Sequence, residues 1–173
     1  MPSKRSISKT GSAPTCPTCG MPVFLGLPQI GVAGLIVERP LKEIADLSGS
    51  AYADRILWAE LLRAGLRRNE LRACYLWKHE PKEDELKWHL LETVRYMKGV
   101  KILMFLGSEV TQPLLGYNAS DVSGVWTKSD FFPKVAVMPG PNPGTLVKGT
   151  VGEMRLAITR FAERMNRIKR VRQ

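Results

Sequence analysis

Four short, predominantly apolar segments of the chain predict β-strands. They are residues 32–37, 71–77, 101–106 and 134–138. The first of them, Val32 to Val37, is continuously apolar and is bounded by Gly31 and by the polar Glu38 and Arg39. Continuous apolar runs of this length are typical of strands that are buried on both faces of a sheet.

Between these segments, apolar residues recur three or four positions apart, which predicts amphipathic helices. We expect helices over residues 53–64, from 81–84 to 97, from 107 to about 115, and over 150–170. Residues 117–133 predict a long irregular connection. Residues 139–144 predict a rigid loop, because their prolines suit neither a strand nor a helix.

The alternation of strands and helices predicts an α/β fold. Strands of this kind favour a three-layer α/β/α arrangement around a four-stranded parallel sheet. Such sheets bind ligands beyond the carboxyl ends of their strands. We therefore expect the functional rim at residues 38–40, 78–80, 106–108 and 138–140.

The composition narrows the class of protein. The chain has 173 residues, of which 44% are hydrophobic, so it suits one domain with a substantial core and excludes global disorder. No apolar run approaches the about 20 residues that span a bilayer, and the polar, basic start does not resemble a signal peptide. Three cysteines suit a reducing compartment. We expect a cytoplasmic protein without a membrane partner, divided into a basic flexible arm (1–14), a folded domain (15–165) and a basic tail (166–173).

The net charge of +10 is concentrated at the two ends of the chain. Residues 1–12 carry +3 and residues 160–173 carry +5, so the middle is close to neutral. Basic ends of this kind indicate an anionic partner, nucleic acid before membrane, and DNA contacts are expected from Arg167, Lys169 and Arg170. The alternative is that both ends only keep the protein in solution.

A separate motif concerns metal binding. Cys16 and Cys19 have the Cys-x-x-Cys spacing of a metal knuckle, and a tetrahedral site needs two more ligands. The chain contains only two histidines, His79 and His89, both in the second strand–helix unit. Together the four residues predict a Cys₂His₂ zinc site. The alternatives are a redox pair or two independent thiols, and Cys74 is expected to be a buried apolar residue.

Several motifs also follow one another in a defined order. They are Cys16 and Cys19, Val37-Glu38-Arg39-Pro40, Gly65-Leu66 with Cys74 to Pro81, Asp84-Glu85 with His89, and Leu106-Gly107-Ser108 with Leu114-Leu115-Gly116. This series resembles the uracil-DNA glycosylase superfamily, and is most similar to its iron–sulfur branch, family four. The resemblance covers about residues 16–165.

The resemblance implies a glycosylase-like fold and a set of site residues. Glu38 matches the catalytic carboxylate, which orients water during hydrolysis of the base–sugar bond. Tyr75, Met138 and Lys78 would line the base pocket. The loop that enters the minor groove corresponds to Pro139, Gly140 and Asn142.

The resemblance also bears on the metal. The four positions that hold the branch's cluster cysteines correspond to Cys16, Cys19, His79 and His89. Zinc suits this ligand set, and an iron–sulfur cluster with two cysteine and two histidine ligands is the alternative. The implied role is structural.

The chain departs from the motifs of this branch at three points, and these differences leave two activities open. The glycines of the branch's first motif are absent, Tyr75 replaces the base-reading asparagine, and Met138 replaces the histidine of the last motif. The first reading is a DNA glycosylase that excises uracil or another modified base. The second is a catalytically impaired relative that acts as a DNA-binding, replication-accessory or adaptor module.

Other classes of function are also open to the chain. A nucleotide-handling enzyme would need a glycine-rich phosphate loop after the first strand, where the chain has Glu38-Arg39-Pro40-Leu41 instead. A protein–protein adaptor that mimics or blocks a host glycosylase is a further class. We expect a monomer that binds DNA and a replication or repair protein. The small size and the altered catalytic motifs suit a phage-encoded member.

Overall fold

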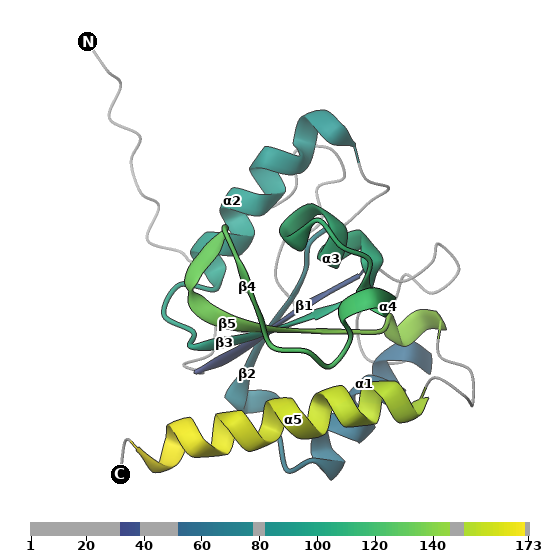
Figure 1. Ribbon diagram of the computed structural model, residues 1–173, viewed down its shortest axis with the longest axis vertical. Coiled ribbons are helices and arrows are strands. Elements are labelled where there is room, and N and C mark those ends of the chain that lie inside the picture. The colour runs from purple at the N-terminus through teal and green to yellow at the C-terminus, as the bar shows by residue number, and fades with distance from the viewer. Residues whose placement is uncertain (1–31, 39–51, 78–81, 146–150, 172–173) are drawn as a thin grey trace, which may run out of the picture.

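The computed structural model describes residues 32–38, 52–77, 82–145 and 151–171. In this part of the chain a five-stranded sheet lies at the centre, with helices on both faces (Figure 1). The strand order is β2-β1-β3-β5-β4. The strands are β1 (Ala33–Val37), β2 (Leu71–Tyr75), β3 (Ile102–Leu106), β4 (Thr127–Ser129) and β5 (Phe132–Gly140).

The connecting elements are α-helices and short 3-10 helices. The α-helices are α1 (Tyr52–Arg63), α2 (Leu86–Tyr96), α3 (Ser108–Leu115), α4 (Ala119–Val122) and α5 (Val151–Arg170). The 3-10 helices are η2 (Arg68–Glu70), η3 (Glu83–Glu85) and η4 (Pro143–Thr145). Among the helices of the described ranges, none is long and apolar enough to cross a membrane.

The α/β prediction is confirmed, but the sheet differs from the predicted one. Strands β2, β1, β3 and β5 pair in parallel, and Val37 lies opposite both Tyr75 and Leu106. Strand β4 pairs antiparallel with β5, so the sheet is mixed and five-stranded. The short β4 has the sequence Thr-Lys-Ser and therefore carries none of the apolar signal by which strands are predicted.

The sheet separates two apolar clusters because successive strand residues point to opposite faces. Leu35 packs in the cluster that contains α1 and α5, and its neighbour Ile36 packs in the cluster that contains α2 and α3. All residues of β1 and β3 are buried. Figure 1 shows α1 and α5 together on one side of the sheet and α2 and α3 on the other.

Two of the loop predictions are wrong. Residues 117–133 contain α4 and β4, and β5 continues through Pro139 and Gly140, which lie opposite Phe105 and Leu106. Proline fits there because of the direction in which its backbone groups point. The N–H and C=O groups of one strand residue point to the same neighbouring strand, so the carbonyl shows which side lacks the N–H. The Pro139 carbonyl accepts a hydrogen bond from Gly124 N at 2.8 Å, so the missing N–H faces the side where the β4 ladder has ended.

Helix α5 is amphipathic along its whole length. Its buried residues, including Met154, Phe161 and Met165, follow helical spacing and pack against the sheet. The helix continues to Arg170, and Ile168 still packs against the core. The boundary that we predict between residues 165 and 166 therefore falls inside one helix.

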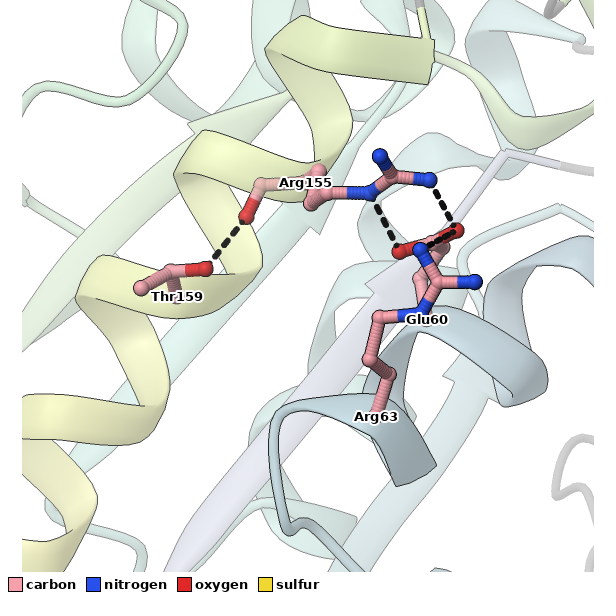
Figure 2. A network of polar contacts seen from close by, with 4 residues as sticks. All are labelled: Glu60, Arg63, Arg155 and Thr159. Atoms are coloured by element: carbon pink, nitrogen blue, oxygen red, sulfur yellow. Dashed lines mark hydrogen bonds and ion pairs between the residues drawn. The ribbon is translucent and has the colours of Figure 1, made fainter.

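A polar network joins α1 to α5 (Figure 2). Arg155 donates two hydrogen bonds to the carboxylate of Glu60, from Nε and Nη2, both at 2.9 Å. Arg63 lies 3.5 Å from the same carboxylate, and the Thr159 hydroxyl donates to the Arg155 carbonyl. The hydrogen bonds from Arg155 hold the pKa of Glu60 below its ordinary value, and they link α5 to α1.

Candidate functional site

Glu38 lies directly after β1, at the carboxyl end of the parallel strands. Its N–H donates to the Leu106 carbonyl at 2.7 Å, which extends the β1–β3 ladder by one bond. Its carboxylate accepts a hydrogen bond from the Glu109 backbone N–H at 3.2 Å. Glu109 belongs to the first turn of α3, where backbone N–H groups favour a negative charge. The backbone thus fixes both the strand end and the carboxylate.

Gly107 leaves the room that this carboxylate occupies. Its φ of 99° is in a region that side chains disfavour, and a Cβ placed on it would lie 2.5 Å from Glu38 Cβ. Gly107 is also the residue before α3, so it turns the chain from β3 into the helix directly beneath Glu38. A glycine at this position is therefore a requirement of the Glu38 geometry.

The environment raises the pKa of Glu38 above its ordinary value of 4.5. Burial is the main cause, and the neighbouring charge of Glu109 acts in the same direction. Hydrogen bonds from the backbone of Glu109 and Ser108 and from the Asn142 side chain oppose it. A carboxylate with a raised pKa is a better proton acceptor near neutral pH.

Asn142 is the one predicted loop residue that the structure places beside Glu38. It hydrogen-bonds the Glu38 carboxyl, and its side-chain oxygen also accepts from Gly144 N at 2.7 Å. This second bond closes a turn after β5 and orients the amide. The Asn142 amide is therefore fixed from one side by its own turn and contacts the Glu38 carboxyl on the other.

The residues predicted to line the base pocket, and the other two of the predicted loop, are buried or lie outside the described residues. Tyr75 is 4% exposed and Met138 is fully buried, both in the cluster beneath α1 and α5. A base would reach either side chain only if its neighbours moved. Pro139 and Gly140 are buried within β5 and do not belong to an exposed loop. Lys78 lies outside the described residues.

One of the four predicted metal ligands is described. His89 is fully buried in α2, with its ring centroid 4.9 Å from those of both Trp77 and Trp88, and its Nε2 is 3.9 Å from a Glu85 carboxylate oxygen. A buried imidazole near the start of α2 suits a ligand role. The described ranges contain no group of three or more residues suited to hold a metal, and Cys16, Cys19 and His79 lie outside them. Cys74 is fully buried, as predicted.

The predicted DNA-binding residues of α5 have different surroundings. Lys169 forms an ion pair with Glu70, so part of its charge is used within the protein. Arg170 is exposed. Arg167 lines a cavity of about 930 Å³ beside Trp126. This cavity was not predicted from the sequence, although the spacing of basic residues four and three positions apart in the last helix was a signal for it.

No family model matches the chain, and a search of curated proteins finds no match.

Proposed function

We propose that this chain is a DNA-binding protein with a uracil-DNA glycosylase-like fold, which hydrolyses the N-glycosidic bond of uracil or another modified base. The observation that carries the proposal is the Glu38 carboxylate. It sits at the carboxyl ends of the central parallel strands, is held by backbone N–H groups, and has a raised pKa. Ligands of parallel sheets bind at this end.

The proposed chemistry uses Glu38 as the proton acceptor. The bond between C1′ of the deoxyribose and the base nitrogen breaks, and the base leaves with the electron pair as an anion that takes its proton from solvent. A water molecule gives a proton to Glu38 and adds to C1′. A nearby carboxylate also stabilises the positive charge that develops on the sugar, as in glycoside hydrolysis. Asn142 helps to orient the carboxylate.

Replacing Glu38 tests this chemistry. Glu38→Gln is expected to slow single-turnover release of uracil or another modified base by at least about 100-fold, because a positioned base contributes at least that much. The wild-type rate should rise with pH through a pKa above 4.5, since only the ionised carboxyl accepts the proton. The measurement is strand cleavage at abasic sites in single- and double-stranded oligonucleotides, with enzyme in excess.

Two controls separate chemistry from folding. Glu109→Gln should remain active and move the acidic limb of the pH profile to lower pH, because it removes a like charge that raises the pKa of Glu38. Because the pKa of Glu38 is raised in the folded protein, ionisation of this carboxyl at higher pH destabilises the fold. Glu38→Gln removes that ionisation, so it should melt at or above the wild-type temperature at neutral pH. Equal rates for Glu38→Gln and wild type on every substrate would refute the role of Glu38.

The burial of Tyr75 and Met138 favours a second candidate function. If a flipped base cannot reach these side chains, the protein would keep the fold without base excision and act as a DNA-binding or adaptor module. Absence of product from all modified bases at enzyme excess, together with measurable DNA affinity, would select this function.

We also propose a structural metal held by Cys16, Cys19, His79 and His89, with zinc favoured over an iron–sulfur cluster. The buried, aromatic surroundings of His89 suit a neutral imidazole ligand. The metal would tie the cysteine motif to the second strand–helix unit.

Metal analysis of protein purified without added metal tests this proposal. We expect roughly one zinc ion per chain, because four such ligands complete a tetrahedral site. Cys16→Ser and His89→Gln should each lower the metal content and the melting temperature. Iron with acid-labile sulfide would identify the cluster instead. Metal content that is unchanged by both substitutions would contradict the four-ligand site.

A further inference from the structure

A cavity lies between the C-terminal half of α5 and the segment that leads into β4. Its volume is about 930 Å³, within the range of ligand-binding pockets. The apolar part of its lining comes from Val125, Trp126, Ile168 and Val171. Lys101, just before β3, also lines it, so the cavity lies near the amino end of that strand. Glu38, by contrast, follows the carboxyl end of β1.

Three arginines of α5 form a row along this cavity. Arg160, Arg164 and Arg167 are four and three residues apart, so they share one side of the helix, and they span about 10 Å at the rise of an α-helix. Arg160 donates to the Gly124 carbonyl at 2.7 Å, and the Arg164 guanidinium lies 4.3 Å from the centroid of the Trp126 ring. Both cations are therefore held in place by the wall of the cavity.

A second hollow continues this surface beyond Trp126. Its volume is about 350 Å³, and Trp126 and Arg164 line both cavities. Lys128 and Lys134 add positive charge here, from β4 and β5. The two cavities together present six basic side chains and one acidic side chain, Glu163. Positive charge therefore lies on both sides of a central aromatic group.

We propose that this track binds single-stranded DNA, at a site separate from the chemistry proposed for Glu38. Unpaired DNA carries one phosphate per nucleotide and a planar apolar base, which matches cations repeated along a partly apolar floor. The Arg164–Trp126 pair supplies a flat surface on which a base can stack. An acidic peptide is the competing ligand, but it lacks the planar groups that this surface suits.

The test measures the affinity of a fluorescent thymidine decanucleotide as a function of salt. The triple variant Arg160→Gln, Arg164→Gln, Arg167→Gln is expected to bind at least tenfold more weakly. The slope of log Kd against log salt should fall by about 2, since each phosphate contact on a single strand contributes about 0.7. Trp126→Ala should weaken binding with little change of slope, because stacking does not release counterions.

The matched control is a second triple variant, Lys82→Gln, Lys87→Gln, Arg95→Gln. It removes the same charge from exposed positions in and before α2, on the opposite side of the sheet. It should bind as wild type. Melting curves establish that each variant is folded. The double variant Lys128→Gln, Lys134→Gln tests the other side of the track and should also weaken binding.

Two outcomes would overturn the proposal. One is equal loss of affinity in both triple variants, which would mean that total charge alone governs binding. The other is displacement of the decanucleotide from wild-type protein by a glutamate-rich peptide of equal charge at equal or lower concentration, which would assign the track to an acidic peptide.

Discussion

Phe161→Ala is expected to lower the free energy of unfolding by about 3–5 kcal/mol, the range for removal of a buried aromatic ring. Phe161 is fully buried in the middle of α5, and it packs in the cluster between α5 and the sheet. Its ring also stacks on Trp126, with centroids 6.2 Å apart and an interplanar angle of 16°. The substitution leaves a cavity and removes the support of Trp126. Urea unfolding followed by circular dichroism measures the effect.

Phe161→Leu is the control for this prediction. It keeps an apolar side chain in the same place, so it should cost much less than Phe161→Ala. Leu156→Ala, at an exposed position of the same helix, should be nearly neutral. Equal stability of Phe161→Ala and wild type would contradict the placement of α5 on the sheet.

Gly107→Ala is expected to cost about 2–4 kcal/mol of stability, because it combines a strained backbone with a steric clash. At a φ of 99° an alanine is disfavoured, and its Cβ would lie 2.5 Å from Glu38 Cβ. Glu38 or the β3–α3 turn must move. The hydrogen bond from Glu109 N to the carboxylate would be lost, so the base excision proposed for Glu38 should fall together with stability.

Gly152→Ala is the matched control. Gly152 lies in α5, and nothing lies within 4 Å of an added Cβ. Alanine is favoured in a helix by about 1 kcal/mol over glycine, so this variant should be as stable as wild type or more so. Thermal melts of both variants, with the cleavage assay beside them, give the comparison. Equal melting temperatures for Gly107→Ala and Gly152→Ala would contradict the close approach of Gly107 to Glu38.

The apolar pattern was sufficient to predict the buried strands and the longer helices. Strands β1 and β3 are buried on both faces, and a segment with that environment must be apolar throughout. Helix α5 could be predicted from its spacing of apolar residues, since one side faces the core and the other faces solvent. These features depend on local periodicity, which a sequence displays directly.

The edge of the sheet could not be predicted in this way. Strand β4 is short and polar, and its pairing with β5 depends on where the chain has already been placed. The extension of β5 through Pro139 depends in the same way on the ladder to β3 and on the bond from Gly124. Both are consequences of contacts between segments distant in the sequence.

Glu38 lies at the carboxyl end of the sheet, as the predicted strand before it required, because that position depends only on topology. The surroundings of Glu38 were not visible in the sequence. Its raised pKa follows from burial and from the charge of Glu109, while hydrogen bonds from the first turn of α3 and from Asn142, a residue of a separate loop, oppose the rise. Tyr75 ends β2 and Met138 lies two residues before the end of β5, but both side chains pack in the core.

By itself, the sequence determined the α/β class, the apolar strands, the positions of the long helices and the concentration of positive charge at the C-terminal end. Tertiary structure alone decided how that charge is used. Lys169 pairs with Glu70, whereas Arg160, Arg164 and Arg167 line a cavity with Trp126. The reason is physical: periodicity is a property of neighbouring residues, whereas a cavity or a shifted pKa arises only when distant segments enclose a shared space.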